Sequence, residues 1–376
     1  MSKKILFVTH ALESRYGAAT SLRLLLEHYS GVEADLLVPR SFRRPRDAAA
    51  TAAPFPSVRR VYELSLPVDL GLLGIGRSFA DKLHGTVHWL SWQRDRNRFR
   101  DLLERNAYDI VHFNSPVLHG MLEPGMPAVT HMRDIVIDPN SPAVDKIANG
   151  LGIVFIDAAT KKPFERVARV MHSATLNNPI DMTGVGLFAG AFRHPRLTER
   201  TTIFSMIGRV SAIKGGELVI KGFRQGAGED ALLLVVGDGP KDYVAHCRML
   251  AGGDPRIVFW GEEENVKKIY AASDYIVRGD PKPCIGRTVY EGLYSGCRVI
   301  MPGPGEPGLL FEAERFRASV EFYRAGDAAS LAAVFSSCTG KKVPARRYFS
   351  NVEDYVRAFD AFLDECLARL NPAQKP

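Results

Sequence analysis

Basic side chains and glycines stand together where the sequence is expected to turn from a strand into a helix. The segment Ile207–Gly216 contains Arg209 and Lys214, and Gly215 follows the lysine directly. The first backbone N–H groups of a helix lack partners within it, and the helix dipole adds positive charge at the same end. Such an end binds phosphate groups, and two cations with an adjacent glycine strengthen that interpretation. The segment therefore predicts a phosphate-binding turn.

A second segment of the same kind, Cys284–Gly292, enters its expected helix at Gly286. Glu291 lies about one and a half turns inside this helix. A carboxylate at that depth is too far from the helix N-terminus to cap it, but it can accept hydrogen bonds from neutral hydroxyl groups. A cationic phosphate site beside a hydroxyl acceptor indicates a nucleoside-diphosphate ligand.

These two segments belong to a series of short motifs in the second half of the chain. In order they are Gly-Arg-x4-Lys-Gly (208–215), Val-Gly-Asp-Gly-Pro (236–240), Phe-x-Gly (259–261), Tyr-x2-Ser-Asp (270–274) and Gly-x4-Glu-Gly-x3-Gly (286–296). Each motif alone is weak, since Gly-Asp-Gly-Pro is an ordinary turn. Five of them in this order, over about a quarter of the chain, are specific. The series resembles the donor-binding half of the family-4 retaining glycosyltransferases.

The resemblance implies an α/β GT-B fold, in which two Rossmann-like doubly wound domains face a cleft and a C-terminal helix crosses back to the first domain. It implies that Arg209 and Lys214 stabilise a leaving diphosphate and that Glu291 binds ribose hydroxyls. The residues expected to bind the sugar-nucleotide donor are Gly17, Gly208, Gly237, Gly261, Asp280, Ile285, Gly286, Arg287, Thr288 and Glu291. Gly17 opens the first expected helix, and the alternative to donor binding is that this glycine serves only to form the turn into the helix. We expect no resident cofactor and no metal ion.

The sequence departs from the family pattern at a position that contacts the donor sugar. The family has a glutamate eight residues before the one that corresponds to Glu291, and this chain has Pro283 there. Ile285 also replaces the usual aromatic residue. Three alternatives remain open. Asp280 takes the place of the glutamate through a shifted loop, or the sugar is held by backbone and first-domain residues, or the protein binds the nucleotide without turnover.

The family motif Asp-x-x-His-x-His has only one of its two histidines here. The segment that starts at Asp109 keeps His112 but has Asn114 in place of the second histidine, which in the family lies near the transferred sugar. His119 and His131 follow closely in the sequence, and parallel strands deliver polar residues to a site at their carboxyl ends. All three histidines are therefore candidates on the acceptor side, and structural packing is the alternative for each.

Length and composition favour two globular domains without a membrane span. The 376 residues exceed what one hydrophobic core usually serves, and 46% hydrophobic with 24% charged residues is an ordinary globular composition. No apolar run reaches the ~18 residues that cross a bilayer. The first strand, Ile5–Val8, follows too closely on Met1 for a secretory signal. Five scattered cysteines fit reduced thiols, so we expect a cytoplasmic location.

Most of the net charge of +7 comes from residues 40–105, which contain thirteen Lys or Arg and seven Asp or Glu. In the helix expected from Phe79 to Leu103, Trp89, Trp92 and Phe99 alternate with arginines. That pattern is typical of a helix resting on anionic lipid headgroups, although an amphipathic helix whose aromatics face the core would look the same. We expect peripheral contact with the inner face of a membrane. We expect no nucleic-acid binding, because no recognised nucleic-acid module is present.

Alternating strands and helices predict a parallel sheet in each half of the chain. We expect an acceptor-side domain over residues 1–181, a linker over 182–200 and a nucleotide-sugar domain over 201–349. Four prolines predict irregular structure in the segment between residue 40 and the long helix. A capping box begins a C-terminal helix over 350–370, whose apolar stripe would pack on the first domain.

Together with the basic segment 40–105, the family resemblance implies a retaining transferase that moves a hexose or N-acetylhexosamine from a UDP- or GDP-sugar to a glycan or polyprenyl-linked acceptor. Such transfers occur in the assembly of bacterial polysaccharides and lipopolysaccharide. Two other functions remain open, a nucleotide-sugar epimerase with the same fold and a nucleotide-sugar-binding protein without turnover.

Overall fold

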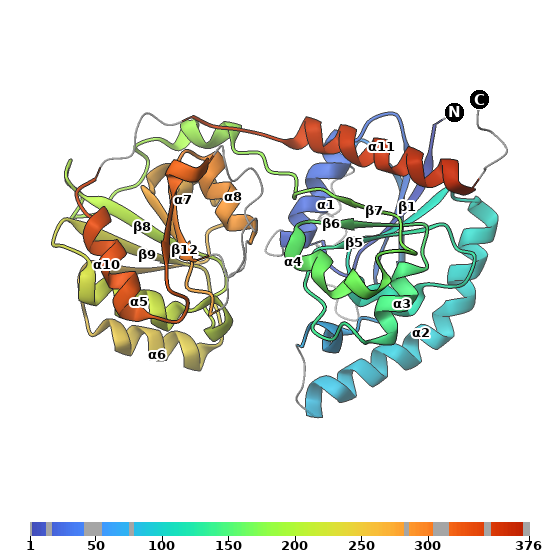
Figure 1. Ribbon diagram of the computed structural model, residues 1–376, viewed down its shortest axis with the longest axis horizontal. Coiled ribbons are helices and arrows are strands. Elements are labelled where there is room, and N and C mark those ends of the chain that lie inside the picture. Colours follow the sequence, from blue (N-terminus) through green and yellow to red (C-terminus); the bar gives the residue numbers. More distant parts are fainter. Residues whose placement is uncertain are drawn as a thin grey trace. The chain divides into compact units, whose positions relative to one another are not determined.

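The computed structural model describes residues 2–12, 17–40, 55–74, 79–281, 286–303, 316–341 and 347–370. The chain forms two compact units. Unit 1 comprises residues 1–179 and 352–376, and unit 2 comprises residues 180–351. Each unit has one parallel β-sheet covered by helices (Figure 1).

Among the described residues, unit 1 has a seven-stranded parallel sheet in the order β3-β2-β1-β4-β5-β6-β7. Its strands are β1 Lys4–Val8, β2 Glu33–Pro39, β3 Val58–Leu64, β4 Ile110–Phe113, β5 Ala128–Met132, β6 Gly152–Phe155 and β7 Ser173–Thr175. The strand order reverses between β1 and β4, which gives unit 1 the topological switch point of a doubly wound sheet.

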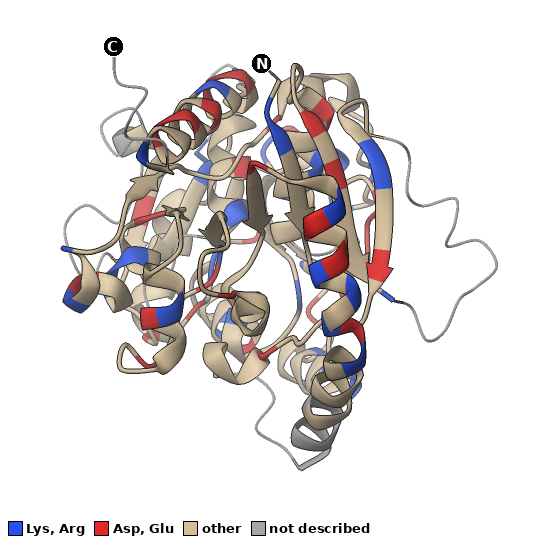
Figure 2. Cartoon of the chain, turned by 90° about the vertical axis from the view of Figure 1, so that its right-hand side faces the viewer, with Lys and Arg blue, Asp and Glu red and all other residues tan. Residues whose placement is uncertain are grey.

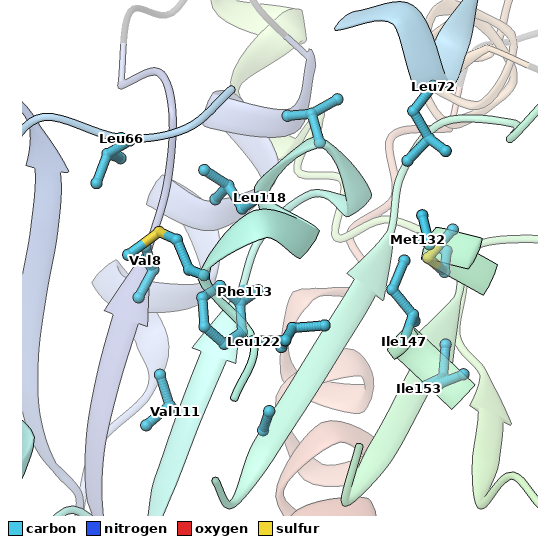
Figure 3. Packing of buried hydrophobic residues seen from close by; sticks show 14 of the residues in the cluster. Val8, Leu66, Leu72, Val111, Phe113, Leu118, Leu122, Met132, Ile147 and Ile153 are labelled. Atoms are coloured by element: carbon cyan, nitrogen blue, oxygen red, sulfur yellow. The ribbon is translucent and has the colours of Figure 1, made fainter. Parts of the chain in front are cut away.

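The helices of unit 1 cover both faces of its sheet. They are α1 Gly17–His28, η2 Leu70–Leu73, α2 Phe79–Asn106, η3 Pro116–Met121, α3 Pro142–Ala148, α4 Ala158–Lys161, η4 Lys162–Val167 and α11 Val352–Leu370. Side chains of β1 alternate between the two faces, as a doubly covered strand requires. Val8, which Figure 3 shows near Phe113, belongs to the cluster that also contains Phe99 of α2. Phe7 belongs to the cluster that contains Phe359 of α11.

Among the described residues, unit 2 has a six-stranded parallel sheet in the order β10-β9-β8-β11-β12-β13. Its strands are β8 Thr202–Ile207, β9 Ala231–Val236, β10 Ile257–Gly261, β11 Tyr275–Val277, β12 Arg298–Pro302 and β13 Val320–Tyr323. Its helices are η5 Thr183–Phe188, η6 Ala212–Lys214, α5 Gly216–Gly226, α6 Lys241–Ala251, α7 Lys267–Ala272, α8 Arg287–Tyr294, η7 Arg317–Ser319 and α10 Ala328–Cys338. The switch point lies between β8 and β11.

Two segments differ from the sequence-based expectation. Strand β3 lies in the segment expected to be irregular, and it escaped prediction because Arg59 and Arg60 are exposed on this edge strand and break any apolar alternation. Residues 182–200 do not form a free linker, since Val185 and Phe192 are buried in the hydrophobic clusters of unit 2. The break between the compact units comes earlier, after Pro179.

Candidate active site

Three of the glycines expected to bind the donor meet at the carboxyl edge of the unit 2 sheet. Gly208, Gly237 and Gly261 follow or end β8, β9 and β10, with φ values of 122°, 123° and 84° that side chains rarely adopt. A Cβ on Gly237 would lie 2.1 Å from the carbonyl oxygen of Gly208, and the Gly237 N–H donates to the Gly261 carbonyl at 2.7 Å. The strand ends therefore approach each other with bare backbone, at the edge where doubly wound sheets bind ligands.

Arg209 and Lys214 lie on the loop that joins β8 to α5. Arg209 is exposed, and its side chain makes no hydrogen bond or ion pair with any residue that the structure describes. The loop is fixed by its backbone, because the Val210 N–H donates to the Asp238 carbonyl at 3.0 Å. Lys214 ends the short helix η6, and its ammonium group lies 3.6 Å from Oδ1 of Asp280.

A close approach between Gly215 and Gly279 joins this loop to the end of β11. Gly215 has a φ of 67°, and a Cβ there would lie 1.6 Å from the Gly279 carbonyl oxygen. A Cβ on Gly279 would lie 2.4 Å from the Gly215 carbonyl oxygen. Two glycines therefore allow the backbones to touch, and this contact places Asp280 beside Lys214.

Arg278, which the sequence analysis did not single out, is buried at the same edge. Its Nε donates to Oδ2 of Asp280 at 2.7 Å, and its Nη1 donates to the hydroxyl of Thr288. A Cβ on Gly286 would lie 2.5 Å from that Nη1. A side chain at Gly286 would therefore require the end of this arginine side chain to shift, a contact that the motif alone did not reveal.

Glu291 is held in place within helix α8. Its Oε1 accepts from Nε of Arg287 at 2.6 Å, and its Oε2 accepts from the hydroxyl of Tyr270 at 2.7 Å. Burial, and then the Glu291 carboxylate, raise the pKa of Tyr270 well above its usual range, so the tyrosine stays a hydrogen-bond donor. A carboxylate accepts about four hydrogen bonds, so Glu291 is oriented and still able to bind hydroxyl groups. Ile285 and Pro283 lie outside the described residues.

At the carboxyl edge of the unit 1 sheet, Asn114 stands where the family has its second histidine. Its side-chain oxygen accepts from Nε of Arg133 at 2.8 Å, and its amide nitrogen donates to the Ala18 carbonyl at 3.1 Å. Nη1 of Arg133 also donates to the side-chain oxygen of Asn178 at 2.6 Å. The amide thus links the ends of β4 and β5 to the start of α1, where Gly17 is exposed.

His112 and His131 are both completely buried beneath α11. Their ring centroids lie 5.6 Å apart, and the rings pack against Phe359, with His131 stacked on Tyr355 as well. Burial, reinforced by the positive charge of Arg133, lowers the pKa of His112 to about 3 and that of His131 well below its usual range. Both rings are therefore neutral at pH 7, and this geometry favours the packing alternative for them.

His119 has a different environment on η3. Its Nε2 lies 3.8 Å from Oδ2 of Asp69, and partial burial lowers its pKa. His119 is thus the one of the three candidate histidines whose side chain keeps some solvent exposure.

No protein-family model matches the chain, and no curated protein matches it in sequence. Solved structures do match it. HepE from Anabaena, crystallised with UDP and glucose, has a TM-score of 0.70 at 16% identity over 96% of this chain and 99% of that one. Sucrose-phosphate synthase from Thermosynechococcus elongatus has a TM-score of 0.66 at 14% identity over 99% and 100%. WaaG, a glycosyltransferase involved in lipopolysaccharide biosynthesis, has a TM-score of 0.59 at 12% identity over 99% and 95%.

The chain has the GT-B fold. Its two Rossmann-like units and the C-terminal helix α11, which belongs to unit 1, were predicted from the sequence as the architecture of this fold.

Two features are absent from the described part of this GT-B chain. No group of three or more His, Cys, Asp or Glu side chains there could hold a metal ion. No helix in the same residues is long and apolar enough to cross a membrane.

Proposed function

We propose that the protein is a glycosyltransferase whose donor is a UDP- or GDP-sugar. The observation that carries the proposal is the arrangement at the carboxyl edge of the unit 2 sheet. There, glycine-lined strand ends adjoin the exposed Arg209 and the half-exposed Lys214, and helix α8 of the same unit carries the oriented Glu291. The presence of UDP with HepE supports a uridine nucleotide as the first donor to test.

In this proposal the diphosphate lies against the β8–α5 loop, and Arg209 and Lys214 face the negative charge that grows on it. The bond from the sugar C1 to the diphosphate oxygen breaks, and a bond from C1 to an acceptor oxygen forms on the same face with retention. The acceptor hydroxyl gives its proton to the departing phosphate, so no enzymic nucleophile takes part. Preorganised charge of this kind is worth about 3 kcal/mol of the barrier per donor group.

Pro283 stands where the family has the glutamate that contacts the donor sugar. Another group must therefore make that contact in this chain. Asp280 is already engaged, because one oxygen accepts from Arg278 and the other faces Lys214. We therefore propose that backbone groups, including the N–H groups at the start of α8, bind the sugar hydroxyls.

We propose that the transferred sugar is a hexose or N-acetylhexosamine. The acceptor that we propose is a glycan or polyprenyl-linked glycan at an anionic membrane surface. Three large apolar residues close together in α2 support the membrane contact. Val87, Trp89 and Leu90 are 51%, 54% and 52% exposed. The arginines of α2 support it less, because Arg96 and Arg100 both pair with Glu123, and positive and negative residues lie side by side on this helix (Figure 2).

Vesicle sedimentation tests the membrane contact. We expect wild-type protein to bind vesicles with anionic lipids more than neutral ones, and Trp89→Ser to reduce that binding. Leu187→Ser in unit 2 is the matched control, because Leu187 is 87% exposed and should not matter. Equal binding by wild type and Trp89→Ser would contradict this role of α2.

Thermal unfolding with nucleotides tests the donor site. UDP or GDP, alone or as its sugar, should raise the melting temperature of the wild type, because a ligand that binds only the folded state stabilises it. Arg209→Ala should reduce the shift without lowering the melting temperature of the free protein, since its side chain has no described partner to lose. The proposal fails if no nucleotide shifts the melting temperature, or if Arg209→Ala responds like wild type.

A further inference from the structure

Arg278 and Asp280 form a buried ion pair inside the proposed diphosphate site. The two side chains are 7% and 5% exposed, and Nε of the arginine lies 2.7 Å from Oδ2 of the aspartate. The other oxygen of Asp280 lies 3.6 Å from the ammonium group of Lys214, which is 39% exposed. One carboxylate thus faces two cations, and only one of those cations is accessible to a ligand.

We propose that Arg278 sets the charge of the diphosphate site by neutralising Asp280. Without the guanidinium, the Asp280 carboxylate would be compensated mainly by Lys214 and would repel an approaching anion. With the guanidinium in place, the charge of Lys214 is left for the phosphate groups. Arg278 is then a positioning residue that acts through Asp280 and Lys214, and this inference rests on the proposed function.

The geometry around the pair supports a role beyond packing. Arg278 follows the last residue of β11 and also holds Thr288 in the first turn of α8, so it stands at the carboxyl edge of the sheet. A buried ion pair adds little net stability over apolar residues of similar size. A Cβ on Gly286 would lie 2.5 Å from Nη1 of Arg278, so this glycine leaves room for the guanidinium. The ion pair is therefore better explained by its effect on the charge of the site than by a contribution to stability.

Replacing Arg278 and Asp280 one at a time should shift the affinity for a nucleoside diphosphate in opposite directions. Dissociation constants for UDP and GDP are measured by titration calorimetry, and the tighter nucleotide is used as the probe. Asp280→Asn removes a negative charge beside Lys214 and should tighten binding about tenfold. Arg278→Met leaves the carboxylate to compete for Lys214 and should weaken binding about tenfold. The double variant should return to within about threefold of wild type.

A second ion pair in the same unit provides the control. Arg256 and Asp254 lie 2.8 Å apart with similar burial, but they precede β10 and so stand at the amino edge of the sheet. Asp254→Asn and Arg256→Met should leave the affinity for the nucleotide unchanged. In a Lys214→Ala background, Asp280→Asn should lose most of its tightening effect, because the lysine charge that it releases is gone.

The outcomes separate the inference from the proposed function. If wild type binds neither UDP nor GDP, the proposed function fails. If wild type binds and Lys214→Ala weakens binding, but Asp280→Asn weakens binding or leaves it unchanged, the proposed role of Arg278 is overturned and the pair is structural. Should Arg278→Met not fold, the sign of the Asp280→Asn shift decides alone.

Discussion

Replacing Gly215 by alanine should damage the site more than its backbone angle alone would suggest. Its φ of 67° costs a residue with a Cβ about 1–2 kcal/mol. The added Cβ would also lie 1.6 Å from the Gly279 carbonyl oxygen, a backbone atom that cannot rotate away. The β8–α5 loop and the end of β11 must therefore separate, which adds at least about 2 kcal/mol and displaces the loop that carries both Arg209 and Lys214 from the diphosphate site.

Gly253→Ala provides the reference, because Gly253 has a φ of 74° and nothing within 4 Å of its Cβ position. This variant should lower the free energy of unfolding only by the backbone cost, about 1–2 kcal/mol. Urea denaturation gives the free energy of unfolding of both variants, and nucleotide titration gives their affinities. We expect Gly215→Ala to lose at least about 3 kcal/mol, summed from these two costs, and to bind UDP more weakly. Equal losses for the two variants, with unchanged affinity in both, would refute the reasoning.

Three further predictions concern the interior of unit 1 and the ribose contact. Phe359→Ala should lower the free energy of unfolding by about 3–5 kcal/mol in urea titrations, because the ring is completely buried against His112 and His131; a loss below ~1 kcal/mol would contradict that packing. The folded-state pKa of His112, about 3, lies below its ordinary value of 6.5, so the unfolded state binds the proton first. The free energy of unfolding should therefore fall as the pH drops from 6.5 toward 3. In His112→Phe, the free energy of unfolding measured across this range should depend less on pH. Glu291→Gln should weaken binding of a ribonucleoside diphosphate more than that of its 2′,3′-dideoxy analogue, and equal losses for both would exclude the ribose contact.

The sequence indicated most of the fold because its strands are buried on both faces. Runs such as Ala231–Val236 are continuously apolar, and glycines or polar residues mark where they end. Strand β3 was missed for the opposite reason, since Arg59 and Arg60 give an edge strand the composition of a loop. Residues 182–200 show no periodicity, yet Phe192 still finds a buried place on unit 2.

The site was only partly visible in the sequence. Arg209, Lys214 and Glu291 stand in motifs whose spacing can be recognised. Arg278 has no such spacing, and its importance depends on Asp280 and Thr288, which the fold brings to its side chain. The one available signal was a charged residue directly after a short buried strand.

Histidine spacing was the least informative part of the sequence. His112 and His131 stand near polar strand ends in the sequence, but their side chains face the side of the sheet that α11 covers. That burial depends on a helix more than two hundred residues later in the chain, at Val352–Leu370. A local motif carries no information about such a distant cover.

Binding of a diphosphate by the cations of the β8–α5 loop can be measured directly, through the ratio of the UMP to the UDP dissociation constant. Lys214 should contribute to UDP binding through a charge-assisted hydrogen bond worth about 1.5–3 kcal/mol, and much less to UMP. We expect Lys214→Met to lower this ratio at least about tenfold while the affinity for UMP barely changes. A ratio that stays the same in Lys214→Met would contradict it.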